Sequence, residues 1–249
     1  MKKLILMTIV ATQTLLALVS IQPVEIGVQP GITGKVEAGF ETKRGNTDKD
    51  NYKASLRVVY DSNKDYVTWA ELSGEYGESN KVEDTNKAYI HLRYIHALTK
   101  DNLRGELFFQ SQENKFKNIK RRRLGGAGVR YKLFSFFEKD NSYLGLGAFY
   151  ESILYTTALD EDENTYRLNS YFAYTTPFGD DSTFTYTLYY QPSFDKFNDY
   201  IVTNSLELKL HIYKELFLKF NIKYDKDTKP PLGVEDYDFT QTTSFVYNF

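Results

Sequence analysis

The sequence predicts an all-β chain that folds into a twelve-stranded antiparallel up-and-down transmembrane β-barrel. Three observations predict it: segments in which apolar and polar residues alternate, connections that are alternately short and long, and an aromatic carboxyl terminus. The composition agrees, because 16% of the residues are aromatic, with 21 Tyr and 18 Phe, and these residue types favour pleated sheets. Beyond the first twenty residues, no stretch approaches the length of a transmembrane helix, about 18 continuous apolar residues.

The amino-terminal segment carries the pattern of a secretory signal peptide. Lysines precede an apolar stretch from Leu4 to Val19, which is typical of such a peptide. A transmembrane anchor is the alternative, but the stretch is short for a hydrocarbon core of about 30 Å and no charged stop-transfer flank follows it. We therefore expect residues 1–20 to be a signal peptide, residues 21–31 a lead-in segment and residues 32–249 the barrel.

Alternation with a period of two residues predicts the strands. Val36, Ala38 and Phe40 alternate with Glu37 and Glu41, so one face of this first strand is apolar and the other is charged. The same rule applied along the chain predicts strands at residues 34–41, 52–60, 66–76, 87–94, 103–110, 122–133, 144–150, 166–174, 183–191, 200–212, 216–224 and 237–249.

The connections support the same architecture. Short ones, such as residues 61–65 and 98–102, mostly follow the even-numbered strands, whereas longer and highly charged ones, such as residues 77–86 and 113–121, mostly follow the odd-numbered strands. Bacterial outer-membrane barrels have short periplasmic turns at one rim and longer extracellular loops at the other. Both termini would then be periplasmic, and we expect the protein in the outer membrane of a Gram-negative bacterium.

Soluble β-barrels and sandwiches also alternate, and they are the rival folds. In those folds the apolar face points inward, and twelve strands would enclose an oversized interior. Tyrosines stand at the ends of the apolar rows, as with Tyr52 and Tyr60 or Tyr166 and Tyr174. This spacing fits two aromatic girdles that flank a hydrocarbon band, so we prefer the membrane barrel.

The chain ends with Phe245, Tyr247 and Phe249 at alternate positions. This pattern is similar to the assembly signal of outer-membrane barrels, in which the last strand ends in Phe, and it implies the barrel-assembly machinery as a partner. The alternative is that Phe249 simply belongs to an aromatic girdle.

Two stretches resemble a known family. They are "RGNTDKDNYKASLRVVY" and "GELFFQSQENKFKNIKRRRLGGAGVRYKL", and the features that carry the resemblance are the run at residues 45–47, Phe116, and the glycines Gly125, Gly126 and Gly128. They resemble the family of salt-induced outer-membrane proteins, a domain of unknown function. The resemblance implies an outer-membrane location, and it carries over no catalytic or ligand-binding residue.

The inward faces of the strands supply the candidate site. Near mid-height the first six strands present charges of alternating sign, whereas the later strands present mostly small or neutral polar groups. Charges on neighbouring strands lie about 5 Å apart and must be paired or hydrated. The residues expected to line the lumen are Glu37, Arg57, Glu71, Arg93, Glu106, Arg130, Arg167, Glu207 and Lys219.

This interior allows two interpretations. The charges could crosslink and stiffen the wall, leaving only a narrow water path in a non-transporting barrel with a structural or envelope-adaptation role. Alternatively the lumen is a narrow channel for small hydrophilic solutes or ions, in which the paired charges set a field and the neutral half gives room. Basic residues outnumber acidic ones at inward positions, so a modest preference for anions is expected.

An outer-membrane phospholipase-type enzyme is the rival functional class, because such barrels carry a Ser/His/Asn set on the outer wall. By parity His91 and His211 face inward, and His96 faces outward with no obvious Ser and Asn beside it. The chain has no Cys and no metal-ligand spacing. We therefore expect no catalytic residue, no metal site and no cofactor.

The stretch "ENKFKNIKRRR" is expected to form a basic extracellular loop. Its basic residues are Lys115, Lys117, Lys120, Arg121, Arg122 and Arg123. Lipopolysaccharide phosphates are the partner that such a loop would suit, since Lys and Arg pair well with phosphate; the alternative is a solvated loop without a partner. Nucleic acid is not an expected partner, because the net charge of −2 gives no bulk attraction to it.

Overall fold

Twelve antiparallel strands form one closed barrel, in which each strand pairs with its neighbours in the chain and β1 pairs with β12. This confirms the fold class that the sequence predicts. The computed structural model describes residues 24–43, 49–99, 102–133, 135, 137, 139–157, 160–179 and 181–249. The expected signal peptide, residues 1–20, lies outside these described residues.

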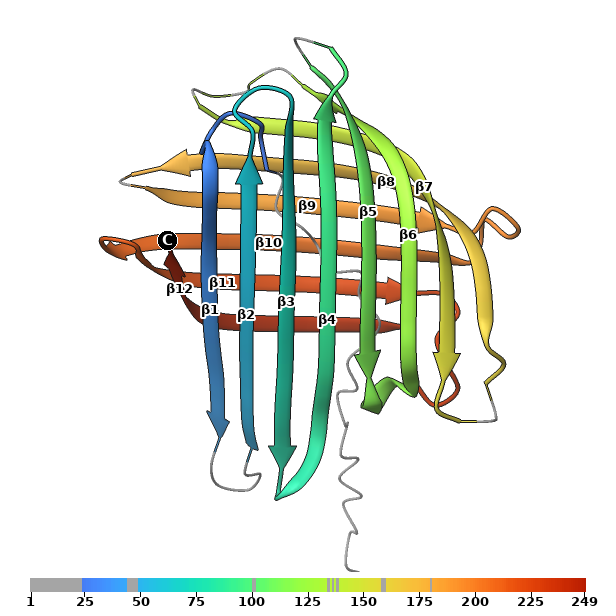
Figure 1. Cartoon of the computed structure of the whole chain (residues 1–249). Helices are drawn as coiled ribbons and strands as arrows, with labels where there is room; N and C mark the ends of the chain where they lie inside the picture. The colour runs from blue at the N-terminus through green and yellow to red at the C-terminus, as the bar shows by residue number, and fades with distance from the viewer. Residues whose placement is uncertain are drawn as a thin grey trace, which may run out of the picture.

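Eleven of the twelve strands are longer than the sequence predicts, and the extra residues lie at their ends; β12 is one residue shorter. In Figure 1 the amino-terminal strands, blue to green, run across the carboxyl-terminal strands behind them, orange to red. The strands are β1 (Gly31–Lys43), β2 (Lys49–Asp61), β3 (Tyr66–Ser79), β4 (Val82–Ala97), β5 (Leu103–Asn114), β6 (Ile119–Lys132), β7 (Asn141–Tyr155), β8 (Glu163–Phe178), β9 (Ser182–Pro192), β10 (Tyr200–Tyr213), β11 (Leu216–Asp227) and β12 (Tyr237–Asn248).

The last residue of the chain helps to close the barrel. β1 and β12 pair from Ala38 opposite Phe245 to Lys35 opposite Asn248. Beyond them, the Gly34 amide donates to the Phe249 carbonyl at 2.7 Å and the Phe249 amide donates to the Gly34 carbonyl at 2.9 Å. A side chain at residue 34 would overlap the Phe249 ring, so glycine lets the aromatic terminus lie against the seam.

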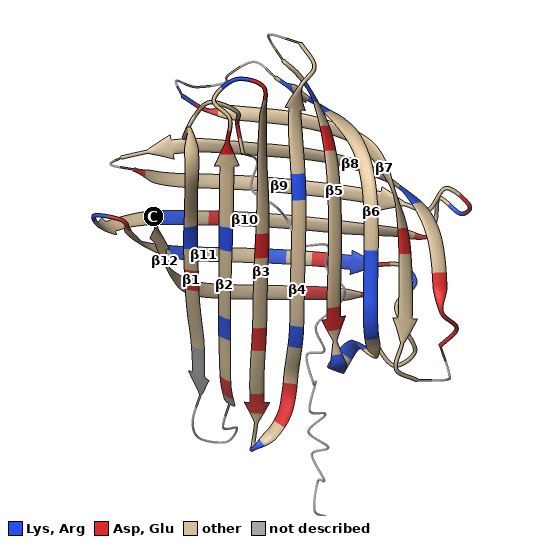
Figure 2. Cartoon of the chain, viewed as in Figure 1, with Lys and Arg blue, Asp and Glu red and all other residues tan. Residues whose placement is uncertain are grey.

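Alternation along the strands places most of their apolar side chains outside and most of their charged side chains inside. On β1, Val36 and Phe40 are 45% and 69% exposed, whereas Glu37 between them is 3% exposed. Figure 2 shows that Lys, Arg, Asp and Glu are spread along the strands rather than confined to their ends. The barrel is therefore inverted relative to a soluble protein, with an apolar exterior and an ionic interior.

The two rims of the barrel differ. β1 begins and β12 ends at one rim, which we call the terminal rim; it also carries the turns at residues 62–65, 179–181 and 214–215. The opposite rim, the loop rim, carries the connections at residues 156–162 and 228–236.

At the loop rim the contrast in length is smaller than the sequence predicts. The expected loop at residues 77–86 is mostly strand, with a turn of only Asn80 and Lys81, both of which have the positive φ (51° and 65°) that a two-residue hairpin turn requires. The expected loop at residues 113–121 is a short 3₁₀ turn, η1 (Lys115–Lys117), between β5 and β6. The highly charged residues of these two stretches, which favour a loop, therefore mostly continue the strands instead.

No helix in the described part of the chain is long and apolar enough to cross a bilayer.

Candidate functional site

All nine residues that the sequence places in the lumen lie on the inward face of the barrel. Seven of them are buried, and the Glu71 and Glu207 side chains are 13% and 15% exposed. They do not form one continuous ladder of alternating charge, however. Arg57 pairs with Glu71, with Nε 2.6 Å from Oε2, but Glu37 pairs with lysines and not with Arg57.

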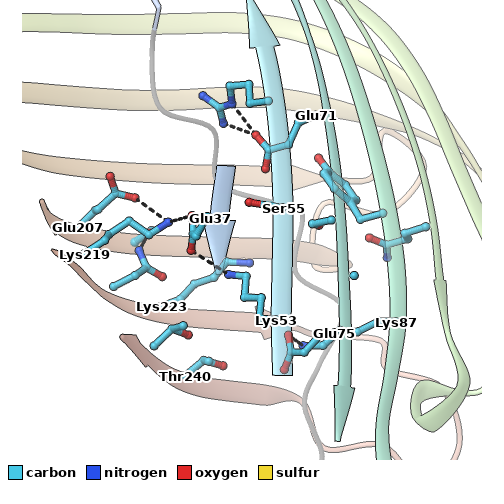
Figure 3. A pocket seen from close by; sticks show the side chains of 18 of the residues that line it. Glu37, Lys53, Ser55, Glu71, Glu75, Lys87, Glu207, Lys219, Lys223 and Thr240 are labelled. Carbon is cyan, nitrogen blue, oxygen red and sulfur yellow. Dashed lines mark hydrogen bonds and ion pairs between the residues drawn. The ribbon is translucent and has the colours of Figure 1, made fainter. Parts of the chain in front are cut away.

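Glu37 belongs to a group of charges that joins the two ends of the chain. Lys219 Nζ on β11 contacts Glu37 Oε2 on β1 and lies 3.8 Å from Glu207 Oε2 on β10. On its other side Glu37 lies 3.8 Å from Lys53 Nζ on β2. Figure 3 shows Lys219 between the two glutamates, with Lys53 below Glu37. These pairs crosslink the strands on both sides of the seam.

This group lines a cavity of about 230 Å³ inside the barrel (Figure 3). Charged side chains of β1–β4 form one side of it, including the pair of Glu75 and Lys87, which lie 2.8 Å apart. The other side, from β9 to β12, combines charged side chains such as Glu207, Lys219 and Lys223 with small polar groups. These small polar residues are Thr185, Thr187, Ser205, Asn221, Thr240 and Thr242. The side chains of Glu75 and Lys87 are 21% and 31% exposed, so water reaches this part of the lumen.

A different part of the lumen is filled by side chains, which we call the closed layer. It consists of Trp69, Arg93, Glu106, Phe108, Arg130, Tyr143, Tyr171 and Tyr189, each at most 6% exposed. Because solvent does not reach these side chains, the lumen is not an open pore at their level.

Glu106 is the centre of the closed layer. Its carboxylate accepts hydrogen bonds from the Tyr171 hydroxyl, 2.9 Å from both oxygens, and lies 3.4 Å from Arg130 Nε and 3.9 Å from Arg93 Nη1. Buried charges need such partners, because the cost of removing them from water is otherwise uncompensated. Two arginines, from β4 and β6, and a phenol from β8 thus surround one carboxylate from β5, and the group keeps one positive charge in excess.

Aromatic rings cover the two arginines. The Arg93 guanidinium lies 5.7 Å from the Trp69 ring centre and 5.3 Å from that of Phe108, and Arg130 lies 4.6 Å from the Tyr143 ring. A ring face attracts a desolvated cation and shields it from water. Arginine and aromatic residues therefore stabilise each other in the closed layer.

Glycines on β6 and β7 make room for these rings. A side chain at Gly145 would overlap the Tyr171 ring, and a Cβ at Gly126 would lie 2.6 Å from Phe108. The sequence interpretation takes the small residues of the second half as open space. That is wrong for Gly145 on β7, where the Tyr171 ring occupies the space, and for Asn169 on β8, which accepts from Gln191, although the small residues of β9–β12 do line the cavity.

The expected basic loop is not a single patch. Lys115 and Lys117 lie in η1, whereas Lys120, Arg121, Arg122 and Arg123 lie in β6. Arg122 is buried and faces inward with the parity of Arg130, as the alternation of the strand predicted at residues 122–133 indicates, so it belongs to the lumen and not to the loop. Its guanidinium contacts Glu151, which also pairs with Arg167, 2.9 Å from Nε.

Lys117 also points inward, at the loop rim. It is 1% exposed and its ammonium lies 3.1 Å from Asp238 Oδ2 on β12. Burial, opposed by the charge of Asp238, lowers the pKa of Lys117 below the usual value of a lysine. Its ammonium therefore loses its proton more readily than that of an exposed lysine.

Residues 24–29, which we call the N-terminal segment, enter the lumen at the terminal rim. Glu25 contacts Arg104, Lys132 and Tyr143, and Val24 and Ile26 pack against Val67, Trp69 and Ile95. The sequence interpretation treats this stretch as a lead-in. Because this stretch has no periodicity, its contacts in the lumen could not be predicted, and the one feature that points to them is the acidic Glu25 among apolar residues.

Each of the three histidines lies on the face of its strand that alternation predicts. His91 is fully buried in the lumen beside Trp69 and Tyr89, and His211 Nε2 lies 2.7 Å from the Lys214 carbonyl. His96 faces outward, and its Nδ1 lies 3.2 Å from the Tyr94 hydroxyl. Within the described residues, no three His, Cys, Asp or Glu side chains gather in a way that could hold a metal ion.

Comparison with known proteins supports the architecture. The structure is similar to the COG4313 outer membrane channel from Pseudomonas putida F1, with 10% identity, a TM-score of 0.54, and coverage of 92% of this chain and 100% of that one. It is also similar to the NanC porin, with 11% identity, a TM-score of 0.50, and coverage of 87% and 97%. At such low identity these similarities show the fold alone. No curated protein matches the sequence. Residues 36–249 match the family model described as "Protein of unknown function, DUF481", and the chain therefore belongs to this family.

Proposed function

We propose that this chain is an integral barrel of the Gram-negative outer membrane. The observation that carries the proposal is the inverted barrel: apolar side chains cover the outside of a closed sheet whose charges lie inside. A closed barrel leaves no unpaired strand edge, which is what hydrocarbon demands of a spanning sheet. The strands have 11 to 16 residues, and about 9–11 suffice to cross a bilayer when tilted.

Aromatic pairs near both rims support this placement. Tyr66 near the terminal rim lies 5.9 Å from Tyr60 and 5.4 Å from Tyr94, between ring centres. Near the loop rim, Tyr150 and Tyr166 lie 5.0 Å apart. Tyrosine rings of this kind favour the two interfaces of a membrane. The test is extraction: the protein should require detergent, and a mature chain that is soluble without it would contradict the proposal.

The lumen supports a gated conduit for small hydrophilic solutes or ions, with a preference for anions. The cavity offers ammonium, guanidinium, carboxylate and hydroxyl groups to such a solute, and the closed layer is the barrier that must move for it to pass. The preference for anions rests on the excess of basic over acidic residues at inward positions of the whole barrel. Conductance of the purified protein in planar bilayers tests this. Brief, anion-selective openings are expected, whereas cation selectivity or silence at all voltages would contradict it.

A non-transporting envelope barrel is the second candidate, and the dry closed layer favours it. Three buried charges and five rings fill this level of the lumen, which stiffens the wall. We propose a role in adaptation to salt for such a barrel, on the strength of the family resemblance. Protein abundance in cells shifted to high NaCl, and the detergent sensitivity of cells lacking the gene, would test it. Catalysis is the least favoured class, because the partner of outward His96 is a tyrosine hydroxyl.

Two partners follow from the membrane placement. Arg121 and Arg123 lie on the outward face of β6 near the loop rim, where lipopolysaccharide phosphates would lie. Phe249 completes the seam, so we propose that the barrel-assembly machinery recognises it together with Phe245 and Tyr247. Loss of co-purifying lipopolysaccharide in Arg123→Ala would test the first, and slow assembly of a chain lacking Phe249 would test the second.

A further inference from the structure

The N-terminal segment closes the terminal end of the lumen by occupying a binding site on its wall. We infer that Glu25 is a built-in mimic of a small carboxylate solute, and that such a solute displaces the N-terminal segment and opens the terminal end of the lumen. This inference rests on the proposed conduit and names both the class of its solute and the device that regulates it.

The wall groups around Glu25 form a carboxylate site. Arg104 Nη2 on β5 lies 3.6 Å from Oε1, Lys132 Nζ on β6 lies 3.3 Å from Oε2, and the Tyr143 hydroxyl on β7 donates to Oε2. A guanidinium, an ammonium and a phenol that converge on two oxygens suit a planar carboxylate. The three strands hold these donors whether or not Glu25 lies between them.

The surrounding charges also favour an anion. Arg130 donates to the Val24 carbonyl at 2.5 Å and lies beside Arg93, with Glu106 as the carboxylate that pairs with both arginines. When Glu25 leaves, Arg104 and Lys132 lose a carboxylate partner and the wall gains one unit of positive charge. A small anion that enters the site restores the pairing, whereas a neutral solute does not.

The N-terminal segment is attached by contacts that can be exchanged. It forms turns and bends instead of pairing as a strand, and Pro30 follows it before β1. Apart from Glu25, its anchors are the Val24 carbonyl, which accepts from Arg130, the Asp61 carboxylate, which accepts from the Gly27 and Gln29 amides, and the apolar contacts of Val24 and Ile26. No strand hydrogen bonds need to break for the N-terminal segment to leave the lumen.

Labelling of a single cysteine tests the displacement directly. The chain contains no Cys, so Ile26→Cys gives one thiol, which is half-buried against Trp69, and Val24→Cys gives a second position. The full chain, purified from outer membranes in detergent, is treated with a polar maleimide. Glu25→Gln should raise the labelling rate about tenfold, because it replaces charge-assisted bonds with weaker neutral ones. Glu83→Gln is the matched control, since Glu83 pairs with Lys115 at the opposite rim.

The solute class is tested with succinate against its neutral counterpart succinamide. Succinate should speed labelling of the Glu25 protein and have little effect on the Glu25→Gln variant, and succinamide should affect neither. Equal labelling rates in all of these conditions would overturn the inference.

Conductance separates this inference from the proposed conduit. Glu25→Gln should open more often than the unmodified chain and remain anion-selective. If labelling responds as expected but no variant conducts, the conduit is wrong and the mimicry stands. If the barrel conducts but neither labelling nor conductance depends on Glu25, the mimicry is wrong and the conduit stands.

Discussion

The closed layer and the cavity are built from the same alternating strands but have different interiors. In the closed layer, Arg93, Glu106 and Arg130 are each at most 5% exposed, whereas Lys53 and Lys87 in the cavity are 34% and 31% exposed. Both regions contain paired charges, so charge alone does not decide whether the lumen is open. The difference lies in the rings, which fill one region and are replaced by Thr, Ser and Asn in the other.

The largest contrast should come from removing one cation in each region. Arg130→Met leaves Glu106 buried with only a distant arginine at 3.9 Å and a phenol, and we expect it to cost about 3–5 kcal/mol of unfolding free energy. Urea unfolding in lipid vesicles, followed by the fluorescence of Trp69, the single tryptophan, measures it.

Lys87→Met is the control in the cavity. Its pair with Glu75 is partly hydrated, so the expected loss is under about 1 kcal/mol. Equal losses in the two variants would mean that the closed layer is as wet as the cavity.

The glycines that admit the rings provide the second contrast. Gly145→Ala forces the Tyr171 ring out of its position, and we expect a loss of about 3 kcal/mol from overpacking. Gly74→Ala adds the same methyl group where the nearest atom is 3.9 Å away, and it should be neutral or slightly stabilising. The temperature at which the barrel loses its compact gel mobility measures both. A tolerated Gly145→Ala would show that the ring is not fixed.

Much of this architecture can be predicted from the sequence, because the period of two fixes which side chains face inward wherever a strand exists. Glu37, Arg93 and Lys219 lie in the lumen for that reason. The ends of the strands are not predictable in this way. The charged residues Glu83 and Asp84, expected in a loop, continue β4 because Lys115 and Ser79 contact their carboxylates.

Which side chains fill the lumen cannot be predicted from alternation, because it depends on contacts between residues that are distant in the chain. Tyr171 reaches Glu106, which is 65 positions away in the chain, and whether Gly145 is empty space depends on the direction of a ring on the next strand. The N-terminal segment has no period at all, so Glu25 could be placed only by the distant groups that bind it.

The third contrast tests the Tyr171 hydroxyl, which donates a hydrogen bond to Glu106 in the closed layer. Tyr171→Phe removes a donor 2.9 Å from both carboxylate oxygens and changes little else. Hydrogen bonds to buried charged groups contribute about 1.5–3 kcal/mol, so we expect a loss of about 2 kcal/mol in the same urea experiment. Tyr190→Phe on the outward face is the control, and it should have almost no effect. A loss that is no greater than that of the control would contradict the central place of Glu106.

The smallest effect is expected from the matching change in the cavity. Ser205→Ala also removes one hydroxyl, the one that accepts from Asn221 Nδ2 at 2.9 Å. A cavity of about 230 Å³ holds several waters, at about 30 Å³ each, and one of them can replace the lost acceptor. We therefore expect a loss of about 0.5 kcal/mol. Because this variant and Tyr171→Phe each delete a single oxygen, their difference reports how much water each region contains. If Ser205→Ala were as costly as Tyr171→Phe, the cavity would be as dry as the closed layer, and a path for hydrophilic solutes would have to be sought elsewhere in the barrel.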